Sequence, residues 1–292
     1  MSKKYFQIGF GLIPLFFFFL VLLAVPLPVL AETVKIHLVA IEKEVKVADD
    51  QTYAAWTFNG TIPGPVLRVK EGDTVEFTLE NKGTMPHSMD FHAAQTAPDR
   101  NYVVVAPGKS LTYTWKAQYP GVFYYHCGAP PMVQHIANGM YGALIVEPKN
   151  PLPKAREYVL VQGELYASST DVAAMMAKTP KNLMFNGAVN KHVAEPLQAR
   201  PGELVRIHVV NAGPGLFSAF HVIGGIFDKV YESGNPANVL RGIQTWTIPP
   251  GGGATFDITF PEAGTYPFVT HSIPDALHGG LGLIRVSEEV KP

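Results

Sequence analysis

The only cysteine of the chain stands among residues that bind soft metal ions. His135 follows Cys127 by eight residues and Met140 follows His135 by five. These three side chains can meet at one ion if another strand supplies a second imidazole, and His87 is the candidate. Two histidines, one cysteine and a weakly bound methionine favour a copper ion that alternates between Cu(I) and Cu(II). Zinc sites usually have more thiolates or a closed tetrahedral set without methionine.

A plainer interpretation treats these residues as core. Cys127 would then be a small buried apolar side chain, and Met140 would fill space. A single cysteine cannot form an internal disulfide, so the thiol is buried, reactive or bound to metal. The spacing of four such residues in one chain favours the metal.

A second metal site is predicted from histidines that the first set leaves over. His126 is bonded directly to Cys127, and successive side chains of a strand point to opposite faces. The two residues therefore suit two ions, joined by a short covalent path for an electron. His92 and His271 are the best remaining partners of His126. Three neutral imidazoles leave a position open for water or a small anion, as in catalytic metal sites.

Short β-rich runs between turn signals must position these ligands. In "TVEFTLE", Val75, Phe77 and Leu79 share one face and polar residues the other, which predicts a half-buried strand. Glycine (27) and proline (25) are frequent, and the regular spacing favours antiparallel β-sandwiches over βαβ units. One helix is predicted in "STDVAAMMAKTP", with Thr170 or Asp171 as its cap.

The second half of the chain repeats the first. "FNGTIPGPVLRVKEGDTVEFTLEN" from Phe58 is echoed from Phe185, and "APGKSLTYTWKAQYPGVFYYH" is echoed by a segment that ends at His271. A repeat of this length indicates a duplicated domain. We predict an all-β fold of two tandem Greek-key sandwiches, residues 33–148 and 155–288, joined by a linker over 149–154.

The N-terminal residues 1–31 are predicted to be a secretory signal. Lys3 and Lys4 precede an uncharged apolar run that ends in "PVLAE". The run is long enough to serve as an uncleaved membrane anchor instead. Either way the rest of the chain is expected outside the cytoplasmic membrane, in the periplasm or its equivalent. Without the two lysines, 21 Lys plus Arg face 24 Asp plus Glu, a net charge of -3, and no basic stripe remains to suggest a nucleic-acid partner.

The pattern resembles the copper-containing nitrite reductases, which are two-domain cupredoxin enzymes. The resemblance covers nearly the whole mature chain and is carried, in the family's order, by "HSMDFHAA", "YYHCGAPPMVQHIANGM", "FHVIGG", "QTWTIP" and "VTHS". It implies one type 1 copper and one type 2 copper per subunit. The type 1 ligands would be His87, Cys127, His135 and Met140, and the type 2 ligands His92, His126 and His271. It also implies a homotrimer in which His271 comes from the neighbouring subunit.

The resemblance further assigns four residues around the type 2 copper. Asp90 and His221 would feed protons to nitrite, whose reduction to nitric oxide and water consumes one electron and two protons. Ile223 would lie above the copper, and Thr245 would orient His221. The implied electron donor is a small redox protein, either a cupredoxin or a cytochrome c.

The sequence departs from the family at three places, and the same residues separate the rival functions. The loop from Cys127 to His135 is one residue shorter than expected, Gln244 stands in place of an acid, and Ile226 in place of a histidine. A laccase-like oxidase would need His-x-His pairs, and the sequence has none. The alternative of a different class is an exported electron-transfer or copper-binding protein without nitrite turnover.

Overall fold

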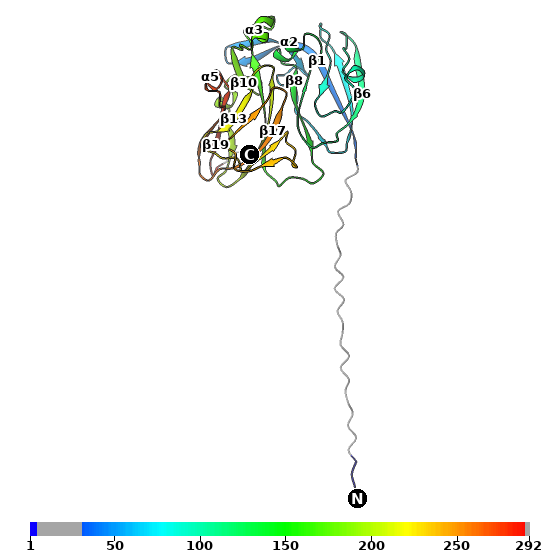
Figure 1. The fold of residues 1–292 in the computed structure, drawn as a ribbon, viewed down its shortest axis with the longest axis vertical. Coiled ribbons are helices and arrows are strands. Elements are labelled where there is room, and N and C mark those ends of the chain that lie inside the picture. The colour runs from blue at the N-terminus through cyan, green and yellow to red at the C-terminus, as the bar shows by residue number, and fades with distance from the viewer. Residues whose placement is uncertain (5–30, 290–292) are drawn as a thin grey trace. The chain divides into compact units, whose positions relative to one another are not determined.

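The computed structural model describes residues 1–4 and 31–289, and strands dominate the fold (Figure 1). The described residues from Ala31 to Glu289 belong to one compact unit. Most of the predicted signal, residues 5–30, lies outside the described residues. Within the described part of the chain, no helix has the length and apolar character needed to cross a membrane.

Two four-stranded sheets form from the first half of the chain. Their orders are β2-β1-β4-β6 and β3-β8-β7-β5. The strands are β1 (Thr33–Ala48), β2 (Gln51–Phe58), β3 (Leu67–Lys70), β4 (Thr74–Asn81), β5 (Asp90–Phe91), β6 (Ser110–Lys116), β7 (Gly121–His126) and β8 (Tyr141–Glu147). The predicted alternation in β4 is confirmed: Val75, Phe77 and Leu79 are buried in the core between the sheets.

The second half forms a six-stranded and a five-stranded sheet. Their orders are β10-β9-β12-β17-β14-β15 and β11-β19-β18-β13-β16. The strands are β9 (Arg156–Leu165), β10 (Asn182–Phe185), β11 (Leu197–Ala199), β12 (Leu204–Gly213), β13 (Ser218–Val222), β14 (Lys229–Glu232), β15 (Val239–Leu240), β16 (Thr245–Ile248), β17 (Gly253–Thr259), β18 (Gly264–Thr270) and β19 (Leu281–Val286).

The sheets are mixed rather than purely antiparallel, which corrects the sequence-based expectation. In the first half β1 pairs in parallel with β4, and β3 with β8. In the second half β9 pairs in parallel with β12, and β11 with β19. Parallel neighbours need a connection that crosses over. Strand alternation cannot reveal this pairing, because it reports burial and not direction.

The repeated "FNG" segments adopt the same corner in both halves. Asn59 and Asn186 have φ angles of 58° and 56°, a left-handed conformation that asparagine tolerates better than most residues. Each asparagine side chain accepts a backbone N–H bond from a strand, from Val39 at 2.7 Å and from Val161 at 2.8 Å. The sequence repeat is therefore also a repeat of local hydrogen bonding.

In the part of the chain that the structure describes, five short helices lie in the connections. They are α1 (Pro98–Asn101), α2 (Met132–Ala137), α3 (Val172–Ala177), α4 (Lys191–Ala194) and α5 (Ile273–Leu277). The predicted helix is α3, and Asp171 caps it by accepting the Ala174 N–H at 3.0 Å. The sequence did not predict α2, which carries His135.

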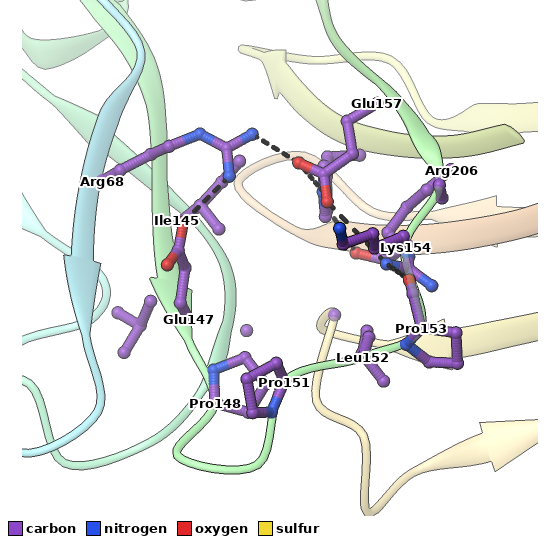
Figure 2. Close-up of a pocket in the computed structure, with 16 residues that line it drawn as sticks. Arg68, Ile145, Glu147, Pro148, Pro151, Leu152, Pro153, Lys154, Glu157 and Arg206 are labelled. Carbon is purple, nitrogen blue, oxygen red and sulfur yellow. Dashed lines mark hydrogen bonds and ion pairs between the residues drawn. The ribbon is translucent and has the colours of Figure 1, made fainter. Parts of the chain in front are cut away.

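Each half has an apolar core of its own, and a further core contains residues of both halves; β7 separates this shared core from the core of the first half. Val122 and Tyr124 point into the shared core, whereas Tyr125 and Cys127 belong to the core of the first half. A cavity of about 380 Å³ opens beside the prolines of the connection from β8 to β9 (Figure 2). Over this connection Arg68 of β3 forms an ion pair with Glu157 of β9 at 2.9 Å.

Candidate copper centres

Three buried donor atoms meet at the end of β7. Cys127 directly follows the strand, His135 lies on α2, and His87 stands in the loop before β5. The Cys127 Sγ lies 3.3 Å from Nδ1 of His135 and 3.9 Å from Nδ1 of His87, and the two Nδ1 atoms are 3.3 Å apart. We call this set the sulfur cluster.

The geometry of the sulfur cluster fits a metal ion. A point equidistant from its three donor atoms lies about 2 Å from each, close to the usual metal–imidazole bond length. The backbone of Met140 is held between the same residues, because Cys127 N–H donates to its carbonyl at 3.0 Å and its own N–H donates to the His135 carbonyl at 3.1 Å. The Met140 side chain is buried.

The electrostatics of the sulfur cluster also favour a cation. Burial raises the pKa of Cys127, although a backbone N–H bond from Ser88 at 3.3 Å opposes the shift. Burial, with repulsion from His87, lowers the pKa of His135 to about 4, and burial lowers the pKa of His87. Both imidazoles are therefore neutral at pH 7 and have lone pairs to donate. A buried thiolate needs a compensating charge, which a metal ion supplies.

A second donor set lies on the opposite face of the same strand end. The Nε2 atoms of His92 and His126 are 3.3 Å apart, and Asp90 Oδ2 is 3.6 Å from the His126 Nε2. Asp90 pairs with His126 across β5 and β7, which brings His92 to the same edge. We call Asp90, His92 and His126 the imidazole cluster.

The tautomer of His126 is fixed by its own chain. Its Nδ1 lies 2.9 Å from the carbonyl of Cys127, so the ring donates there and leaves the Nε2 lone pair for a metal. Burial lowers the pKa of His126, which keeps the ring neutral. The Tyr124 ring stacks on His126 at a centroid distance of 4.7 Å and meets His92 edge-on at 5.1 Å.

A separate pair of histidines lies in the second half. The ring centroids of His221 and His271 are 5.2 Å apart. His221 is on β13, and His271 follows β18 and donates its backbone N–H to Ala219 at 2.7 Å. Among the described residues, the groups of three or more donors that could hold a metal are the sulfur and imidazole clusters, and neither includes His271.

Comparison with known proteins identifies the family. Residues 40–151 match the multicopper oxidase family model. The copper-containing nitrite reductase of Neisseria gonorrhoeae is 40% identical over 89% of this chain and 70% of its own length. That of Alcaligenes xylosoxydans xylosoxydans is 37% identical, with 82% of each chain covered. The chain belongs to the copper-containing nitrite reductase family.

A solved copper nitrite reductase, that of Nitrosomonas europaea, extends the match to the fold. It superposes with a TM-score of 0.87 at 48% identity, over 89% of this chain and 96% of that one. Membership of the copper-containing nitrite reductase family thus agrees with the donor chemistry of both clusters.

The surroundings of His221 differ in detail from the expectation for this family. Thr245 lies opposite His221 in the β13–β16 pair, but the ring's partner is the neighbouring carbonyl of Gln244, 2.6 Å from Nδ1. Because this contact uses the backbone, the Gln244 side chain plays no part in it. Ile223, two residues after His221, is 47% exposed.

Sequence reasoning missed two residues that contact the clusters. Tyr124 lies two positions before His126, so strand periodicity alone could have placed it on the same face. Glu42, whose carboxylate lies beside His87, is 45 positions away on β1. Nothing in the local sequence marks Glu42, because only the fold brings it to that histidine.

Proposed function

We propose that this protein is a copper-dependent reductase that converts nitrite, one electron and two protons into nitric oxide and water. The observation that carries the proposal is the position of two donor clusters on opposite faces of one strand end, with the Cys127 and His126 ligands adjacent in sequence. Bound copper would supply one-electron redox chemistry at the sulfur cluster and an open coordination position for the anion at the imidazole cluster.

The sulfur cluster would form the type 1 site, with His87, Cys127 and His135 as ligands and Met140 as the weak fourth. His92 and His126 would hold the type 2 copper, with His271 as third ligand. The peptide between His126 and Cys127 connects the two sites covalently, and the 2.9 Å contact from His126 Nδ1 to the Cys127 carbonyl gives a second route.

Protons would reach the departing oxygen of nitrite from Asp90 and His221. Asp90 Oδ2 lies 3.6 Å from the metal-binding nitrogen of His126, so it adjoins the place of the anion. The contact of His221 Nδ1 with Gln244 leaves its Nε2 to hold or release a proton. Ile223 would restrict how the anion lies.

The separation of His221 and His271 from the imidazole cluster supports a homotrimer. A second subunit would bring these two histidines to the Asp90, His92 and His126 of the first. Large apolar side chains are exposed on the segments that carry the pair, which is typical of a subunit interface; they are Ile223, Ile226, Ile273 and Leu277. We further propose that the protein is exported to the periplasm and that a cupredoxin or cytochrome c reduces it.

Nitric oxide release from nitrite tests the function directly. The copper-loaded protein, supplied with a reduced dye and nitrite, should produce nitric oxide, which a nitric oxide electrode measures. His92→Ala should abolish turnover and keep the thiolate-to-copper absorption, whereas Cys127→Ala should remove that absorption. His37→Ala is the matched control, because His37 lies on β1 with an exposed ring.

The same experiment distinguishes the rival function. An electron-transfer protein would show the thiolate absorption and produce no nitric oxide, even with both coppers visible by EPR. That outcome would refute the proposed reductase function but would be consistent with the proposed type 1 site.

A further inference from the structure

The carboxylate of Glu42 lies behind one ligand of the sulfur cluster. Its Oε1 is 3.4 Å from Nε2 of His87, the ring nitrogen opposite the one that faces Cys127. An ionised carboxylate only accepts hydrogen bonds, so His87 is the donor. This contact leaves Nδ1 of His87 without a proton, as a metal ligand requires.

The loop before His87 is built around this carboxylate. The backbone N–H of Thr84 donates to Oε2 at 2.9 Å and that of Met85 donates to Oε1 at 3.1 Å. A Cβ on Gly83 would lie 2.7 Å from both carboxylate oxygens, so a larger residue there would displace the Glu42 carboxylate. Burial alone would raise the pKa of Glu42, but these hydrogen bonds outweigh it and the pKa is lowered.

The other imidazole of the cluster lacks such support. The Nε2 of His135 is buried and has no side-chain hydrogen-bond partner among the described residues; the one polar neighbour that acts on the ring from the backbone is Pro130. The edge of Trp56 packs against that ring at a centroid distance of 4.6 Å. The two histidines are therefore held by different means, and the anionic acceptor belongs to His87 alone.

We propose that Glu42 is a positioning residue that fixes the tautomer and orientation of His87 and lowers the reduction potential of the copper bound there. Metal-bound histidines commonly donate their second N–H to a carboxylate, which makes the ring a stronger ligand. A negative charge near the site also stabilises the more positive oxidised ion. The effect on potential rests on the proposed type 1 copper, whereas the effect on the tautomer does not.

The first experiment uses the copper-free protein. Nitrogen-15 NMR of the histidines should show His87 as the Nε2–H tautomer in the wild type and as a mixture in Glu42→Ala. The exposed Glu44, two positions along β1, gives the matched control Glu44→Gln, which should keep the wild-type tautomer. A wild-type His87 that carries its proton on Nδ1 would overturn the proposal.

The second experiment titrates the thiolate-to-copper absorption against redox mediators. At a fixed ambient potential, Glu42→Gln should raise the ratio of reduced to oxidised copper by about tenfold, since the charge is removed while the side chain keeps its size. Glu44→Gln should leave the ratio unchanged. A purely structural role for Glu42 would lower the melting temperature without moving the ratio, and that result would refute the effect on copper.

The two proposals fail in different ways. If the copper-loaded wild type lacked the thiolate absorption, the type 1 site itself would be refuted, and the NMR experiment would still decide whether Glu42 fixes His87. If the absorption were present and both Glu42 variants kept the wild-type ratio and tautomer, Glu42 would have no positioning role.

Discussion

At the scale of single residues, one imidazole of each donor cluster is oriented by a contact at the ring nitrogen that faces away from the cluster. His126 donates to the Cys127 carbonyl, and His87 donates to Glu42. Tyr124 adds a stacking contact on His126 and reaches across to the second half, where its hydroxyl donates to the Ala212 carbonyl at 3.1 Å. These contacts leave Nε2 of His126 and Nδ1 of His87 unprotonated, each with its lone pair free within its own cluster.

Replacing Tyr124 should separate its two contributions. Tyr124→Phe leaves the buried Ala212 carbonyl without its donor and should cost about 1–3 kcal/mol in the free energy of unfolding, measured by denaturant titration. The ring stays, so copper in the imidazole cluster should be retained. Tyr124→Leu removes the ring as well and should weaken copper binding there by about 10-fold or more, read by EPR and metal analysis.

An unchanged thiolate absorption is the internal control for both Tyr124 variants, because Tyr124 faces away from Cys127. If Tyr124→Leu bound copper in the imidazole cluster as tightly as the wild type, the stacking contact would have no role in that site.

At the scale of elements, the sequence predicted what strand periodicity encodes and missed what packing decides. The opposite directions of His126 and Cys127 follow from the alternation of one strand, and the structure has them so. The helices α2 and α3 are equally short, but α3 begins after a capping side chain, Asp171, whereas α2 begins after Pro131 with no side-chain cap, so nothing in the sequence marked its start. Its position depends instead on contacts with the segment before α3, where Ser169 accepts hydrogen bonds from Gln134 and Asn138.

The contact between β3 and β9 should make stability depend on acid pH. The neighbouring His208 imidazole and Arg68 guanidinium hold the pKa of Glu157 at about 2, below its ordinary 4.5. A lowered pKa in the folded state contributes stability that is full above 4.5 and is lost as the pH falls toward 2. Glu157→Gln should therefore flatten the loss of melting temperature over this range.

The size of that effect is limited by solvent, because Glu157 is 36% exposed. Glu262→Gln removes an equally charged but exposed group and serves as the control. Equal pH dependence of the melting temperature in the wild type and in Glu157→Gln would show that the Arg68–Glu157 contact in Figure 2 contributes nothing to acid stability.

At the scale of the whole molecule, the residues of the proposed type 2 site lie in two separate groups. Asp90, His92 and His126 belong to the first half, and His221 and His271 to the second. The sequence grouped His92 and His126, which the structure brings together, with His271, which it does not, because the relation between subunits leaves no periodic signal in a single chain. Because these groups would meet only between subunits, mixing subunits is the sharpest test of the proposed trimer.

Mixing two inactive variants should restore activity only if the site is shared. His92→Ala and His271→Ala should each be inactive alone. In trimers assembled from equal amounts of both, about a quarter of the sites would combine an intact His92 with an intact His271 from a neighbour, and nitric oxide production should recover to that extent. A mixture of His92→Ala with His126→Ala lacks any such combination and should stay inactive. Should the first mixture be as inactive as the second, His271 does not complete the site of a neighbouring subunit, and the shared-site trimer is refuted.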